Sequence, residues 1–175
     1  MRDRVRHTIA AVLAAAALAS GCGVRPTGVV SAGSLPVAEG RSMTMTLYLV
    51  AGDKLVPVTR RGLAGHPMLP LVQLRIPVTA QESRKGLHTE VPHTEDISGY
   101  VVQASRVLVA SVTGIDIGPG GLKAGGDWSR VALGQLVCTA QAVPGVSRVK
   151  VEDALNPDTE SATLTCDDFS GLLAG

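Results

Sequence analysis

The chain has 175 residues, of which 45% are hydrophobic and only 2% aromatic, and its formal net charge is +1 at pH 7. This length corresponds to one domain, whose core must be built almost entirely from aliphatic side chains. No block of basic residues occurs along the chain, which argues against nucleic-acid binding.

The N-terminus has the three parts of a secretory signal peptide. Arg2, Arg4 and Arg6 form a positive start, residues 9–18 are apolar, and small residues then lead to Cys22. The apolar stretch is too short to be a transmembrane helix, because spanning a bilayer takes about 20 residues. An ordinary signal peptide would leave Cys22 as a free thiol, which an exported chain rarely keeps.

The residues around the cut site resemble the lipobox of bacterial lipoproteins, reading Leu18-Ala19-Ser20-Gly21-Cys22. The resemblance implies that residues 1–21 are a lipoprotein signal peptide, removed before Cys22. It also implies that the Cys22 thiol carries diacylglyceryl, which anchors the protein through fatty acyl chains such as palmitate. Two acyl chains are enough for stable attachment. We therefore expect an extracytoplasmic protein on the outer face of the cell membrane.

Cleavage changes the charge of the chain. Residues 1–21 contain three of the 16 basic residues and one of the 15 acidic residues, so 13 and 14 remain and the net charge is near −1. We therefore expect no electrostatic membrane binding beyond the lipid. Residues 22–42 are rich in Gly and Pro and predict a lipidated flexible linker with a root-mean-square span of about 25 Å.

The ordered part of the chain is predicted to begin with a β-hairpin. Residues 43–50 alternate and then become apolar, Gly52-Asp53 supplies a turn, and residues 55–59 return as a second strand. Pro57 lacks an N–H, so this second strand is expected at a sheet edge.

Two short helical segments are predicted next. Pro70 can start the first, and Pro77 stops it. Thr79 and Glu82 have the spacing of a capping box, and Gly86 supplies the positive φ of a helix end.

A strand pair is predicted over residues 100–112, followed by a loop at 118–126. The strongest helical pattern covers residues 128–142, with Asp127 as its N-cap. Strands at 146–151 and 162–166 complete the chain. This order predicts a single small α+β domain, in which two helical regions pack on one face of a mixed or antiparallel sheet.

Three segments, in this order and spacing, resemble the GerMN domain of sporulation and spore-germination proteins. Residues 45–58 resemble its first hairpin, residues 82–92 its Glu-x-x-x-Gly-Leu-x-Thr-x-hydrophobic-Pro stretch, and residues 132–146 its second helix and Pro-Gly-Val turn. The resemblance covers residues 43–155 and implies a module similar to ring-building motifs, with a non-catalytic role in the cell envelope. Residues 156–175 would be a C-terminal extension packed on this domain.

With Cys22 lipidated, Cys138 and Cys166 remain as an even pair in an oxidising compartment. A disulfide between them is favoured on that ground. The alternative is two separately buried thiols, which behave as small apolar residues.

Other chemical patterns are weak. Ser147 and Lys150 match the Ser-x-x-Lys of penicillin-binding enzymes, but on a strand this spacing puts them on opposite faces. His88 and His93, with nearby carboxylates, could bind Zn²⁺, but their spacing fits no standard metal site and favours a solvated polar loop. We therefore predict no catalytic residue, no cofactor and no metal.

The predicted function is a membrane-anchored, non-catalytic interaction or scaffolding module that binds an envelope or membrane-complex protein. The alternative is a lipoprotein that binds a solute or a cell-wall ligand. An envelope hydrolase has the least support from these residues.

Overall fold

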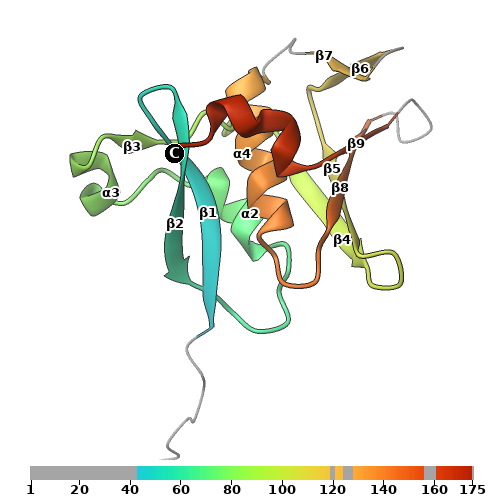
Figure 1. The fold of residues 1–175 in the computed structure, drawn as a ribbon, viewed down its shortest axis with the longest axis horizontal. Coiled ribbons are helices and arrows are strands. Elements are labelled where there is room, and N and C mark those ends of the chain that lie inside the picture. Colours follow the sequence, from blue (N-terminus) through green and yellow to red (C-terminus); the bar gives the residue numbers. More distant parts are fainter. Residues whose placement is uncertain (1–42, 119–120, 124–127, 156–160, 175) are drawn as a thin grey trace, which may run out of the picture. The chain divides into compact units, whose positions relative to one another are not determined.

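The computed structural model describes residues 43–118, 121–123, 128–155 and 161–174. The signal peptide and linker predicted for residues 1–42 lie outside this part. The predicted fold class is confirmed, since one small α+β domain contains two main sheets and a few helices (Figure 1). One sheet is antiparallel with three strands, the other is mixed with four, and helix α4 lies between them.

The predicted hairpin forms the three-stranded sheet. Strands β1 (Thr44–Ala51) and β2 (Lys54–Arg61) pair along their whole length, and the short β3 (Leu87–His88) pairs with the end of β1. The strand order β2-β1-β3 leaves β2 at an edge, as its Pro57 predicted.

The two helices between β2 and β3 begin and end as their local signals predict. Helix α2 (Leu69–Leu74) has a proline in its first turn, and α3 (Ala80–Arg84) starts at a complete capping box. The N–H of Glu82 donates to Thr79 Oγ1 at 3.3 Å, and the N–H of Thr79 donates to Glu82 Oε2 at 2.7 Å.

The second sheet has the order β4-β5-β8-β9. Its strands are β4 (Ile97–Val102), β5 (Val107–Val112), β8 (Arg148–Asp153) and β9 (Ala162–Leu164). Strands β5 and β8 are parallel and are joined by a crossover through α4 (Arg130–Gln141), while the other pairs are antiparallel.

Two sequence-based expectations between β5 and α4 are wrong. The segment predicted as a loop from residue 118 instead pairs β6 (Asp116–Gly118) with β7 (Gly121–Lys123). The N-cap of α4 is Ser129, whose hydroxyl accepts the N–H of Ala132 at 2.9 Å, and not Asp127. Trp128 precedes the helix because its indole is buried and donates to the carbonyl of Thr113 at 2.8 Å.

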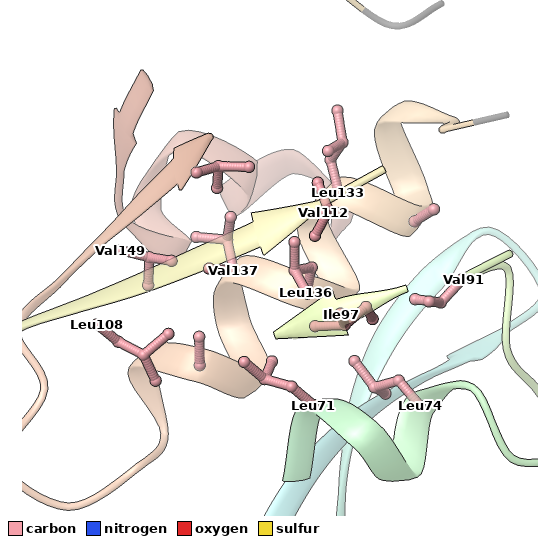
Figure 2. Packing of buried hydrophobic residues seen from close by; sticks show 14 of the residues in the cluster. Leu71, Leu74, Val91, Ile97, Leu108, Val112, Leu133, Leu136, Val137 and Val149 are labelled. Atoms are coloured by element: carbon pink, nitrogen blue, oxygen red, sulfur yellow. The ribbon is translucent and has the colours of Figure 1, made fainter. Parts of the chain in front are cut away.

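The core is aliphatic, as the composition requires. Side chains of α4 pack against α2 on one side and against β5 and β8 on the other (Figure 2). The labelled members of the cluster are Leu71, Leu74, Val91, Ile97, Leu108, Val112, Leu133, Leu136, Val137 and Val149.

Two polar side chains of α4 are also fully buried, and they complete the open edge of β1. Thr139 Oγ1 accepts the N–H of Tyr48 at 2.9 Å, and Gln135 Nε2 donates to the carbonyl of Tyr48 at 2.9 Å. Gln135 Oε1 also accepts the N–H of Glu90 at 2.7 Å. Because both backbone groups of Tyr48 bond to α4, Pro57 can face Tyr48 across the hairpin without leaving a β1 acceptor unpaired.

Gln135→Leu should therefore lower the free energy of unfolding by about 2–4 kcal/mol, because it leaves the Tyr48 carbonyl and the Glu90 N–H without partners. Urea unfolding at pH 7 measures this change. Gln103→Leu is the matched control, since Gln103 is exposed and should change stability by less than about 0.5 kcal/mol. An equal effect of the two variants would contradict the role assigned to Gln135.

A nearly buried ion pair links β2 to α3. Arg60 donates from Nε to Glu82 Oε1 at 2.9 Å and from Nη2 to Glu82 Oε2 at 2.7 Å. Arg60 Nη1 also donates to Gln73 Oε1 at 3.2 Å, which ties α2 into the same group. The hydrogen bonds from Arg60, helped by those from Thr79 and opposed by burial, lower the pKa of Glu82 from 4.5 to about 2.

This lowered pKa predicts a pH-dependent contribution to stability. A group whose pKa is lower in the folded state stabilises the fold above its unfolded pKa, so the contribution is full above about pH 4.5 and disappears as pH falls toward 2. At pH 7 it amounts to about 3 kcal/mol. The difference in unfolding free energy between the natural protein and Glu82→Gln, measured with urea, should become smaller as the pH falls from about 4.5 toward 2. A difference independent of pH would refute the assignment.

Candidate interaction surface

The cysteines predicted to pair are brought together, whereas Cys22 lies outside the described residues. Cys138 is on α4, and Cys166 is the first residue of the 3₁₀ helix η1 (Cys166–Leu172), just beyond the strand on which it was expected. Their sulfur atoms lie 1.89 Å apart and their Cα atoms 4.6 Å apart, which is disulfide-bonding distance.

The pair holds the C-terminal segment against α4 and β2, and this segment contains a 3₁₀ helix, η1, that the sequence analysis did not predict. The ring of the buried Phe169 lies against Gly134, where an added Cβ would come within 3.1 Å of the ring. The N–H of Ala174 donates to the carbonyl of Leu55 at 3.1 Å. A signal for η1 was present, because Thr165 and Asp168 form a capping box like that of α3.

Loss of the Cys138–Cys166 bond should lower the free energy of unfolding by about 3–4 kcal/mol, because it opens a loop of 28 residues. The double variant Cys138→Ala/Cys166→Ala and the reduced natural protein should show similar losses in urea unfolding. Thiol titration of the denatured, unreduced chain in a Cys22→Ser background should find no free thiol. Two free thiols per chain would refute the pairing.

Three of the four residues in the weak chemical patterns, Ser147, Lys150 and His93, have structural partners. Ser147 Oγ donates to the carbonyl of Arg106 at 3.2 Å, while Lys150 pairs with Glu152 at 3.2 Å. His93 Nδ1 lies 2.5 Å from the carbonyl oxygen of Arg75, and His88 is exposed on β3. Among the described residues, no three His, Cys, Asp or Glu side chains lie close enough together to hold a metal ion.

The four-stranded sheet turns one face toward α4, and its other face is exposed at the edge strand β4 but buried at Val109 in its centre. Leu108 on β5 and Val149 on β8 point into the core. Because side chains alternate along a strand, the residues that follow them, Val109 and Lys150, point to the opposite face of the sheet. The register aligns a row across the outer face, comprising Tyr100, Val109, Lys150 and Thr163. Tyr100 is 58% exposed, and its strand β4 is an edge of the sheet.

The charges on this face are only partly paired. Ser111 Oγ donates to Glu152 Oε1 at 2.7 Å, and Lys150 Nζ lies 3.2 Å from Glu152 Oε2. The Ser111 hydrogen bond, together with Lys150 and against the effect of burial, lowers the pKa of Glu152. Arg148, the first residue of β8, is exposed and is engaged by no side-chain hydrogen bond or ion pair within the described part.

Two grooves lie on either side of the loop of residues 62–68, and one of them borders the edge strand β4. The first, here called the β4 groove, has a volume of about 510 Å³ and runs between that loop with α2 and the edge strand β4. The second has a volume of about 610 Å³ and lies between the start of β1 and the loop that follows α4. We call it the tether-side groove, because Met43, the first described residue, forms part of its wall.

Exposed apolar side chains gather at these grooves. Met43 and Leu63 line the tether-side groove and are 46% and 60% exposed, and Val72 and Tyr100 line the β4 groove. These are four of the seven large hydrophobic residues exposed in the described ranges. Such a local excess of exposed apolar surface is typical of binding sites.

Comparisons with protein-family models, with curated proteins and with solved structures find no match for the chain. No helix in the described ranges is both long and apolar enough to cross a bilayer. Function must therefore be argued from the residues and from this surface.

Proposed function

We propose that the protein is an extracytoplasmic lipoprotein, anchored to the outer face of the cell membrane through Cys22, that acts as a non-catalytic interaction module of the envelope. The signal-like N-terminus and the lipobox-like residues support the anchor. A cysteine pair at bonding distance suits an oxidising compartment. The partner is a protein of the envelope or of a membrane complex.

The observation that carries the proposal is Tyr100 beside the β4 groove. Aromatic side chains at the centre of a concave apolar surface contribute much of the binding energy at protein interfaces. Tyr100 stands on an edge strand, between the groove and the outer face of the sheet, so a bound segment could contact both. We propose that the partner inserts an apolar segment into this groove.

A GerMN-type module, similar to ring-building motifs, remains our proposal for the family. The order of hairpin, short helices, strand pair and long helix is consistent with it. Modules of that kind act by contact with neighbouring proteins, which agrees with the proposed role.

Cross-linking in intact cells tests the proposal, followed by purification of the solubilised protein and identification of its neighbours. Tyr100→Ala should lower recovery of the specific partner at least tenfold, because it removes the central apolar contact. Leu155→Ala is the matched control, since Leu155 is 74% exposed but lies outside both grooves. Cys22→Ala should release a folded protein from the membrane fraction.

The outcomes separate the two parts of the proposal. Continued membrane attachment of Cys22→Ala would refute the lipid anchor. Equal recovery of the same neighbours by Tyr100→Ala and Leu155→Ala would refute the β4 groove as the docking site.

One observation favours the alternative of a solute or cell-wall ligand. The tether-side groove, at about 610 Å³, has the size of a small-molecule site and is lined mainly by apolar residues. A saturable thermal shift with a wall fragment, abolished by filling the groove with Gly62→Leu, would support this second function.

A further inference from the structure

Three exposed arginines converge at the end of the domain where the chain arrives from the linker. Arg61 ends β2 and faces Thr44, next to Met43. Arg106 lies in the turn between β4 and β5, and Arg148 starts β8 opposite Val107. The three segments lie close together, since each of them, or a loop next to it, contributes residues to the wall of the tether-side groove. We call this region the tether-side end (Figure 1).

The tether-side end carries no compensating negative charge. The segments 43–46, 61–68, 102–107 and 142–148 contain no Asp or Glu. Acidic side chains lie at the other ends of the same strands, such as Asp53 in the β1–β2 turn and Asp153 at the end of β8. The net charge near −1 of the mature chain, which argued against electrostatic membrane binding, therefore does not describe the charge of this end.

The guanidinium groups of Arg61 and Arg148 are available to a partner. Across the described ranges, neither takes part in a side-chain hydrogen bond or an ion pair, and both are exposed. Arg106 Nε donates to the carbonyl of Gly145 at 3.2 Å, which leaves its other donors open. Arg60 does not contribute, because Glu82 neutralises it.

Apolar side chains stand among these arginines. Met43, Leu63 and Val102 are exposed there, and no other described element covers them. A surface that combines cations with protruding apolar side chains fits the boundary between lipid headgroups and acyl chains. The arrival of the linker at Met43 favours the same partner, because the proposed anchor at Cys22 is joined to this end by residues 23–42.

We propose that the tether-side end docks on the membrane itself, with Arg61, Arg106 and Arg148 on anionic lipid headgroups and Met43 and Leu63 inserted between them. This inference rests on the proposed membrane anchorage and deepens it. Docking in this way orients the domain and holds the β4 groove close to the bilayer surface. The protein partner would then be met at that surface.

The strength of the interaction suits a tethered domain. Each arginine near an anionic surface raises partitioning about fivefold, so three raise it about a hundredfold. A hundredfold increase in partitioning would bind a protein free in solution only weakly. A short flexible linker supplies an effective concentration of the order of millimolar, at which such a preference is enough to orient the domain.

The test supplies the anchor chemically, so it does not depend on lipidation in cells. The chain from Cys22 to Gly175, with its other two cysteines paired, is coupled through the Cys22 thiol to a maleimide lipid. It is then placed in neutral phosphatidylcholine vesicles or in vesicles with 30% phosphatidylglycerol. Hydrogen exchange measured by mass spectrometry should slow about tenfold in segments 61–68 and 102–107 on the anionic vesicles only.

Matched variants distinguish an effect of the arginines on this face from an effect of the net charge of the chain. Arg61→Glu/Arg148→Glu should abolish the protection, whereas Arg84→Glu/Lys85→Glu, which changes the charge equally on exposed residues around the end of α3, should retain it. Salt at 0.5 M should remove the protection, because it screens exposed charges. If urea unfolding shows that Arg61→Glu/Arg148→Glu is not folded, Arg61→Gln/Arg148→Gln replaces it. This variant should lower partitioning onto the anionic vesicles about 25-fold.

Three results would overturn the proposal. They are equal protection on neutral vesicles, equal loss in both charge-reversal pairs, and equal protection when soluble polyglutamate replaces the anionic lipid. Partner recovery through Tyr100 is measured separately, so failure here leaves the proposed interaction function standing.

Discussion

The fold depends on how β1 satisfies the edge that faces away from β2. The short β3 pairs only with Val50 and Ala51, so the backbone of Tyr48 needs partners from another element. Gln135 and Thr139, one helical turn apart on α4, supply them with hydrogen bonds of 2.9 Å. A buried backbone group without a partner destabilises a fold by about 1–3 kcal/mol, so α4 is held in one rotation and one position along β1.

This constraint assigns a different neighbour to successive residues of α4. Gly134 meets β2 and Phe169, Leu136 and Val137 enter the main core, and Cys138 bonds to the C-terminal segment. The helix is therefore surrounded on nearly all sides by two sheets, α2 and η1, which explains its long run of buried residues. A frame of this kind positions the loops at one end of the domain, where the two grooves lie.

The elements predicted correctly are those coded within a few residues. The hairpin turn, the edge position of Pro57, the Thr79–Glu82 capping box and the end of α4 at Pro144-Gly145 each depend on local backbone chemistry. The predictions failed where a distant contact decided the outcome. The N-cap of α4 is Ser129 and not Asp127, and the indole of Trp128 bonds to Thr113, just after β5.

The candidate site also depends on distant contacts that local sequence signals do not reveal. Exposure of Tyr100 could not be read from an alternating strand, because either face of a sheet can be the buried one. Only the packing of α4 against Leu108 and Val149 decides that Tyr100 points outward. The grooves likewise join segments up to a hundred residues apart, from Thr44 to Pro144.

By itself, the sequence determined the local elements, the fold class, the aliphatic core and the lipobox-like resemblance around Cys22. The tertiary structure alone decided which side of the second sheet faces away from α4, which residues border the grooves and where the charges gather. Arg61, Arg106 and Arg148 are scattered along the chain, and their common end exists only because antiparallel and parallel pairing return the chain to the same place. Net charge sums over a sequence, but an electrostatic surface depends on distances in space, and only folding sets those distances.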